Sequence, residues 1–143
     1  MVVKARVARR SSGGLAAHIG YLQRDGVTRD GEAGRLFGAE SDMIDASAFA
    51  ERSKDDRHHF RFIVSPEDAA ELADLRAYAR DLMAEVQRDL SAPLDWVAVD
   101  HLNTVHPHIH IVLRGRLDDG SDLVISRDYI SRGFRARRGP GGA

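Results

Sequence analysis

The stretch VDHLNTVHPHIHIVLRG, residues Val99–Gly115, decides the fold and holds four of the chain's seven histidines. Two apolar runs, LDWVAVDH and HIHIVLRG, flank the short connection LNTVHP, which predicts an antiparallel hairpin. Side chains at i and i+2 of a strand lie on the same face, so His108 and His110 should project together. His101 ends the preceding strand, and the hairpin should bring it beside them.

Three imidazoles gathered in this way predict a metal site. Structural zinc sites are closed by four ligands, so a three-histidine site with open positions is typical of catalysis. We expect one divalent ion on the imidazole nitrogens of His101, His108 and His110 at ~2.0–2.2 Å. Such an ion polarises a phosphoryl oxygen. His106, in the turn, should lie outside the ligand set.

The N-terminal half predicts a strand, two helices and a second strand. Apolar and polar residues alternate over Val2–Arg9, which indicates a half-buried strand. Helices are expected over Leu15–Arg24 and Ala46–Arg52, with a glycine-rich loop or small hairpin in RDGVTRDGEAGRLFG between them. HHFRFIVS predicts the second strand, and its two leading histidines, His58 and His59, are expected at the surface.

Helix signals follow that strand. Ser65 is expected to be the N-cap of a helix that has Pro66 in its first turn and runs to about Leu90. After the hairpin, the turn DDGSD should lead into a last strand, LVIS, and RDYISRGFRARR should be helical. This order predicts an α+β fold in which helices pack on an antiparallel sheet.

The length of 143 residues fits a single domain over 1–143. The chain ends soon after its last helix begins, so we expect the front part of something longer. With no cysteine, the chain has no disulfide, thiolate metal site or cysteine nucleophile. It has neither a secretory signal nor an apolar run near the roughly 20 residues of a membrane span, and a cytoplasmic location is expected.

Charge is unevenly distributed along the chain, although the net charge is only −1. Basic residues open and close the chain, whereas the segment Glu67 to Asp100 is acidic. If the two ends meet, they form one basic groove that leads to the metal, with the long helix on the opposite side.

A nucleophile is not obvious, because the sequence has no G-x-S-x-G, no P-loop and no G-x-G-x-x-G. The chain has three tyrosines, Tyr21, Tyr78 and Tyr129. Tyr78 lies on the apolar side of the long predicted helix and should be structural. A tyrosine hydroxyl can attack a phosphodiester. The residues alone leave Tyr21 open between packing and attack.

Several motifs together resemble those of a known family. HLNTVHPHIHIVL resembles the third motif of relaxases in the HUH endonuclease superfamily, and His101, His108 and His110 have its spacing. GYLQRDG is similar to the first motif of mobilisation relaxases related to the T-DNA border endonucleases, whose tyrosine nucleophile corresponds to Tyr21. FRFIVSPED resembles the second motif and places its serine at Ser65. LVISRDYISRG resembles the segment that follows the metal hairpin.

The resemblance implies nicking and rejoining of one DNA strand at a plasmid origin of transfer, with Mg²⁺ or Mn²⁺ as cofactor. Tyr21 would attack the scissile phosphate and keep the 5′ phosphate, and the 3′ hydroxyl could reverse the reaction. Single-stranded DNA would be the substrate, with accessory relaxosome proteins and a type IV secretion system as partners. The expected DNA contacts are Arg6, Arg9, Arg24, Arg127, Tyr129 and Arg132.

Two departures from the family pattern stand out. The family often has an aspartate two residues after the leading histidine, where this chain has Asn103. We expect Asp100, or else Asp55 or Asp56, to supply a carboxylate that orients a histidine or activates the tyrosine. The family also usually has an asparagine soon after the strand, where this chain has Arg114 and Gly115.

Two other functions remain open. A three-histidine, metal-dependent hydrolase or oxygenase would not need Tyr21, so Tyr21→Phe would leave it active. A truncated relaxase-like module would bind single-stranded DNA without forming an adduct.

Overall fold

A single antiparallel sheet organises the protein. The computed structural model describes residues 2–9, 14–25, 35–68, 73–102 and 105–130. Its strands are β1 (Val2–Arg9), β2 (His58–Ser65), β3 (Trp96–His101) and β4 (His108–Arg114), in the spatial order β1-β2-β4-β3. The predicted hairpin is therefore the β3–β4 pair, and β4 lies in the centre of the sheet beside β2.

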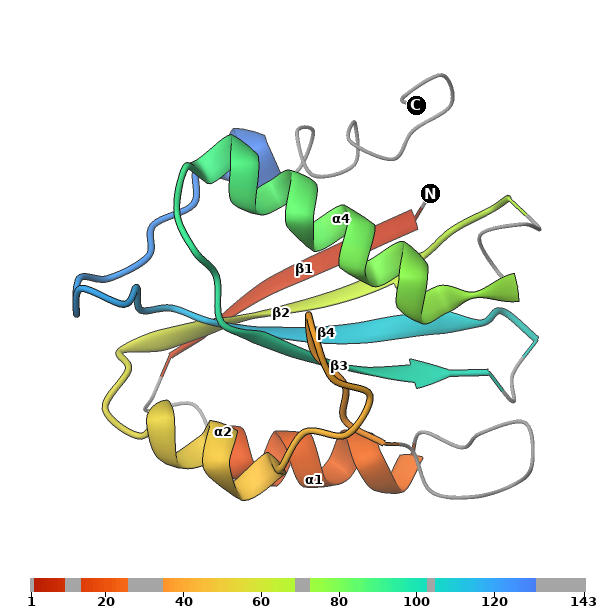
Figure 1. Cartoon of the computed structure of the whole chain (residues 1–143), viewed down its shortest axis with the longest axis horizontal. Coiled ribbons are helices and arrows are strands. Elements are labelled where there is room, and N and C mark those ends of the chain that lie inside the picture. The colour runs from red at the N-terminus through yellow and green to blue at the C-terminus, as the bar shows by residue number, and fades with distance from the viewer. Residues whose placement is uncertain (1, 10–13, 26–34, 69–72, 103–104, 131–143) are drawn as a thin grey trace.

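Helices cover both faces of the sheet, so the predicted α+β fold is confirmed (Figure 1). The face covered by α1 (Leu15–Asp25) and α2 (Ala46–Arg52) is called the α1 face below, and the opposite one, covered by α4 (Leu75–Leu90), the α4 face. None of the helices in the described residues has the length and hydrophobicity that a membrane span needs.

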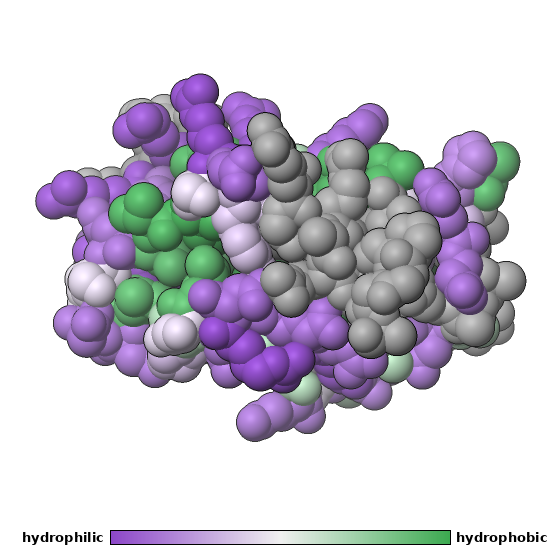
Figure 2. Space-filling model, turned by 90° about the horizontal axis from the view of Figure 1, so that it is seen from above, coloured by the Kyte–Doolittle hydropathy of each residue, from purple (hydrophilic) through white to green (hydrophobic). Residues whose placement is uncertain are grey.

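The α4 face carries the larger hydrophobic core. Phe62, Ile109 and Ile111 of the sheet are almost fully buried there against Leu82 and Val86 of α4. Burial of such aliphatic and aromatic side chains is the main stabilising contribution to the fold. Viewed from the α4 side, exposed hydrophobic residues gather at the left and are bordered by hydrophilic ones (Figure 2).

The α1 face has a smaller core at the β3 side of the sheet. Val97, Val99 and Val112 pack there with Ile19 and Phe49 of the two helices. An arginine network joins this layer to the sheet: Arg114 Nε and Nη2 donate to the two carboxylate oxygens of Asp56 at 2.8 and 2.9 Å.

Gly115, which follows β4, lies against β2. A Cβ at this position would come within 2.2 Å of the carbonyl oxygen of His58. No side chain fits this close approach, so a glycine is required here.

Most predicted elements appear where the pattern placed them. The strands over Val2–Arg9 and His58–Ser65 and the helix over Ala46–Arg52 have the predicted bounds, and α1 is one residue longer than predicted. Most of the glycine-rich loop after α1 lies outside the described residues.

The predicted start of the long helix is wrong. Ser65 is the last residue of β2, and its hydroxyl donates to the carbonyl oxygen of Pro107 at 2.9 Å, so it does not cap a helix. The described helix α4 begins at Leu75, where the Asp74 carboxylate accepts from the backbone N–H of Ala77. Residues 66–68 are not helical, and the hydroxyl that the local Ser-Pro signal assigns to a cap is bonded to a residue that is distant in sequence.

Two further expectations fail. The segment LVIS does not form a β-strand. Isolated hydrogen bonds hold it instead: Leu123 N donates to Gly115 O, and Leu123 O accepts from His58 Nε2. His59 is not a surface residue but only 6% exposed, since β2 points it to the α1 face under the helices. The last predicted helix begins with a helical turn at 127–130, and the rest lies outside the described residues.

Candidate active site

Three histidines meet at one end of the α1 face. His101 lies directly opposite His108 in the β3–β4 ladder, and His110 is two residues further along β4. Their ring centroids are 4.4–5.0 Å apart, and one nitrogen from each ring lies within 4.8 Å of the other two. The hairpin therefore assembles the three side chains as strand parity predicts, whereas His106 is not part of this group.

The backbone orients one of these rings. His108 Nδ1 lies 2.8 Å from the carbonyl oxygen of His106. A carbonyl only accepts, so His108 carries its proton on Nδ1, and its Nε2 lone pair is left to face a metal. This backbone contact takes the place that a carboxylate has in many metal sites.

The protonation state of His110 favours metal ligation at neutral pH. Burial, followed by the neighbouring His101 and His108, lowers the pKa of His110 to about 3. A neutral imidazole keeps the lone pair that metal coordination requires. Three imidazole nitrogens without a carboxylate among the described residues fit a first-row transition ion, whereas Mg²⁺ prefers oxygen ligands.

Helix α1 places Tyr21 beside this cluster. A pocket of about 230 Å³ lies between α1, β1 and β2, and Tyr21, His18 and His110 all line it. Tyr21 is 55% exposed, so it is not a packing residue. Tyr78, by contrast, is 2% exposed in the core, as predicted.

A second hollow adjoins the other side of the cluster. It measures about 750 Å³, and Ser65, Pro107 and His108 are among its lining residues. The two hollows share Lys4 and Ile63. The two hollows are therefore adjacent, with His110 lining one and His108 lining the other. Ser65 borders the second hollow, and its hydroxyl donates to the carbonyl oxygen of Pro107.

No carboxylate accompanies the histidines among the described residues. Asp100 precedes His101 in β3, so it lies on the α4 face, where Arg76 Nε approaches its carboxylate at 3.4 Å. Asp56 is held by Arg114, and Asp55 is exposed before β2. The structure therefore brings none of the three proposed carboxylates to the cluster, and Asn103 lies outside the described residues.

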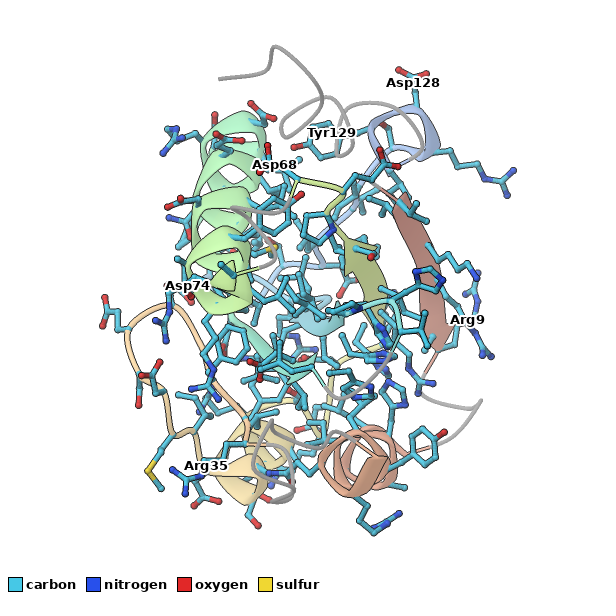
Figure 3. The ribbon with its side chains drawn as sticks, turned by 90° about the vertical axis from the view of Figure 1, so that its right-hand side faces the viewer. Arg9, Arg35, Asp68, Asp74, Asp128 and Tyr129 are labelled. Carbon is cyan, nitrogen blue, oxygen red and sulfur yellow. The ribbon has the colours of Figure 1, made fainter. Side chains whose placement is uncertain are left out.

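The predicted DNA contacts separate into an N-terminal group, Arg6, Arg9 and Arg24, and a C-terminal group, Arg127, Tyr129 and Arg132. Arg6 lines the Tyr21 pocket, and Arg24 is exposed in the last turn of α1. Arg9 projects outward from β1 (Figure 3), on the α4 face.

The C-terminal candidates lie away from the cluster or outside the described chain. Tyr129 lies in the α4 layer, where its hydroxyl donates to Asp89 at 2.7 Å (Figure 3). Arg127 is exposed close by, and Arg132 lies outside the described residues. In the described chain, β1 and β2 bring Lys4, Arg6 and Arg61 to the pocket of His110, and the C-terminal segment up to residue 130 adds no basic residue there. Helix α4 lies on the opposite side, as expected.

Comparison with protein families agrees with this geometry. The family model described as "Relaxase: MobA/VirD2-like, nuclease domain" matches residues 24–133. The chain belongs to this family. The match includes the histidine hairpin of the relaxase, and Tyr21 precedes the matched span. Among curated proteins, no relative matches the chain.

Two residues of the relaxase pocket were not singled out from the sequence. His18 lies three residues before Tyr21 on α1, and both line the pocket with Arg61 of β2. Burial, followed by Arg61 and Arg6, lowers the pKa of His18 to about 4. Helical spacing from Tyr21 could have indicated His18. Arg61 had only a weaker signal, since its neighbours across the sheet come from distant segments.

Proposed function

We propose that this relaxase domain nicks and rejoins one strand of DNA at a plasmid origin of transfer, with Tyr21 as nucleophile. One observation carries the proposal: Tyr21 and His110 line the same pocket, although they are far apart in sequence. A nucleophile and a phosphate-polarising centre must act on the same phosphorus atom, so they need such a shared space.

In the proposed step, the Tyr21 oxygen bonds to the scissile phosphorus, and the bond from phosphorus to the 3′ oxygen breaks. Tyr21 loses its phenolic proton and the leaving 3′ oxygen gains one, so the charge balances. The 5′ phosphate stays on Tyr21 as a diester. Rejoining is the reverse step, in which the 3′ hydroxyl attacks the phosphotyrosine.

The three histidines would hold a divalent ion, Mn²⁺ in preference to Mg²⁺ on the basis of the nitrogen donors. When bound, this ion polarises the phosphate and stabilises the charge that develops in the transfer. The Nδ1 of His108 is engaged by the His106 carbonyl, so its Nε2 is the nitrogen available to the ion. Helix α1 holds Tyr21 over the opposite side of the pocket.

The substrate would be single-stranded around the nick. The two adjacent hollows beside the cluster have apolar lining at Val2, Ile63 and Pro107 and basic lining at Lys4 and Arg6. Unpaired nucleic acid is bound through its bases on apolar or aromatic surfaces and through its phosphates on cations. Accessory relaxosome proteins and a type IV secretion system would be the partners in plasmid mobilisation.

An adduct assay tests the proposal. The chain is incubated with a pool of single-stranded oligonucleotides and Mn²⁺, and the intact mass of the protein is measured. We expect a mass increase equal to the 3′ portion of a cleaved strand, which carries the 5′ phosphate. Tyr21→Phe should bind the same oligonucleotides and form no adduct, with Tyr129→Phe as the matched control.

Other outcomes contradict the proposal in different ways. Cleavage by the Tyr21→Phe variant would indicate a metal-dependent hydrolase. Binding without an adduct in the unaltered chain would indicate a DNA-binding module.

A further inference from the structure

A cluster of cations lines the Tyr21 pocket from the sheet side. Arg6 of β1 lies directly opposite Arg61 of β2, and Lys4 lies opposite Ile63, so all project to the α1 face. The three basic side chains line the pocket together with His18 and Tyr21, and none of the described residues that line it is acidic. The described lining of the pocket is therefore positive.

Arg61 differs from the other partly buried arginines of the described chain. These are Arg76, Arg80, Arg114 and Arg116, and each forms an ion pair with an aspartate. Within the described residues, Arg61 pairs with no carboxylate, and neither do Lys4 and Arg6. Partial burial of a cation without a counter-charge is energetically unfavourable, so this arrangement favours the binding of an anion.

Electrostatic effects within the pocket agree with this reading. Burial and the charge of Arg6 both lower the pKa of Arg61. Burial, followed by the charge of Arg61, lowers the pKa of His18 and that of His59, each to about 4. The charge of Arg61 thus acts on His18 in the pocket and on its own neighbour His59.

His59 holds Arg61 in place. Arg61 Nε donates to His59 Nε2 at 2.9 Å, and His59 is only 6% exposed. A guanidinium has five N–H donors, and this bond uses one of them while it fixes the plane of the group. The terminal N–H groups of Arg61 remain to bind oxygen atoms in the pocket.

Register places this anion beside the scissile phosphate and not upon it. Ile63 lies opposite His110, whereas Arg61 lies opposite Val112, two residues further along β4. Two residues of a strand span roughly 6.6 Å. This offset places the row that contains Arg6 and Arg61 to one side of the histidine-bound centre. A neighbouring phosphate of the same strand can occupy the second row.

We propose that Arg6 and Arg61 bind the backbone phosphate next to the scissile one, and that His59 is a positioning residue for Arg61. This inference rests on the proposed function. It assigns the pocket a ligand of defined chemistry, a nucleic-acid phosphodiester, and it explains why these arginines have no acidic partner in the described chain.

A neutral-backbone scan tests it. Tyr21→Phe protein, which cannot cleave, is titrated with an oligonucleotide from the adduct assay in which single phosphates are replaced by methylphosphonates. At one phosphate next to the scissile position, replacement should weaken binding by about 10- to 100-fold, the range for a hydrogen bond to a charged group. With Arg61→Gln added, the same replacement should have little effect, while Arg88→Gln on α4 should leave it unchanged.

Non-additivity is the decisive result. If the effects of Arg61→Gln and the methylphosphonate simply multiply at every backbone position, the two groups do not meet and the inference is wrong. The methylphosphonate changes only the DNA. Weaker binding of the substituted oligonucleotide to the protein that retains Arg61 therefore cannot result from destabilisation of a protein variant.

Two substitutions at position 59 test the positioning role. His59→Gln retains an acceptor for Arg61 and should keep the dependence on the neighbouring phosphate. His59→Phe removes the acceptor and should lose that dependence as Arg61→Gln does. Equal behaviour of the two variants would exclude the positioning role.

A probe without DNA separates this inference from the proposed function. Inorganic phosphate should shift the Arg61 Nε–H resonance in a saturable manner, and Arg61→Gln should abolish phosphate binding. Saturable binding in a chain that never forms an adduct would overturn the proposed function and leave the anion site standing. Adduct formation together with multiplicative effects in the scan would overturn the anion site alone.

Discussion

The two faces of the sheet use the same four strands in opposite ways. On the α4 face, Phe62, Ile111 and their neighbours form an apolar core under one long helix. On the α1 face, the same strands present histidines and arginines at the side where the helices leave pockets. His110 and Ile111 are adjacent in β4, yet one belongs to the candidate metal centre and the other is fully buried in the core.

This division separates stability from chemistry. Apolar burial on the α4 face stabilises the fold, so the α1 face can hold polar groups whose burial is unfavourable. A pair of substitutions at neighbouring positions should therefore have quite different consequences.

The largest effect is expected from His110→Ala. Loss of one imidazole should reduce adduct formation by ~10²–10³-fold or more, because the group that stabilises the developing charge is weakened. The variant should still unfold cooperatively. Mn²⁺ should raise the melting temperature of the unaltered chain and not that of the variant, since only a bound ion stabilises the native state. An unchanged Mn²⁺ response in the variant would remove His110 from the ligand set.

Ile111→Ala should act on stability instead. Removal of this fully buried side chain should lower the free energy of unfolding by about 2–5 kcal/mol, through lost burial and a residual cavity. Urea denaturation measures the change. Under conditions where the variant is still folded, its rate of adduct formation should match that of the unaltered chain. A rate loss like that of His110→Ala would mean that the two faces are not separable.

A smaller effect is expected from acid. Burial is the main cause that lowers the pKa of His59 from 6.5 to about 4, and the remaining contributions come from the charges of Arg61, His18 and His58, opposed by Asp56. Between these pKa values the unfolded chain binds a proton that the folded chain does not, so stability falls as pH decreases from 6.5 to 4. Above pH 6.5 His59 is neutral in both the folded and the unfolded chain, so it contributes nothing to the pH dependence of stability.

His59→Gln should reduce this acid sensitivity. The slope of unfolding free energy against pH should become shallower by up to about 1.4 kcal/mol per pH unit in that window, the value for one proton. Denaturation curves at several pH values provide the slope, and Arg88→Gln serves as control. If the slopes of the His59→Gln variant and the unaltered chain coincide, His59 titrates normally in the folded protein.

Local patterns account for most of the secondary structure. Alternation of apolar and polar residues placed β1, the run HHFRFIVS placed β2, and the hairpin pattern placed β3 and β4. Strand parity alone brought His108 and His110 together, because side chains of a strand alternate between faces. The same rule, applied to Asp100, would have put it on the face opposite His101. The start of α4 was mispredicted because the Ser65 hydroxyl bonds to Pro107, a residue distant in sequence, and a local capping signal does not reveal such a contact.

What the sequence determined by itself is the histidine cluster, since its three residues lie on two adjacent strands joined by a short turn. The tertiary structure alone decided that Tyr21 shares a pocket with His110 and that Arg6 lies opposite Arg61. These pairs join segments separated by long stretches of chain. Their contact depends on which strands become neighbours and which face each helix covers, and that choice is made by the packing of the whole core.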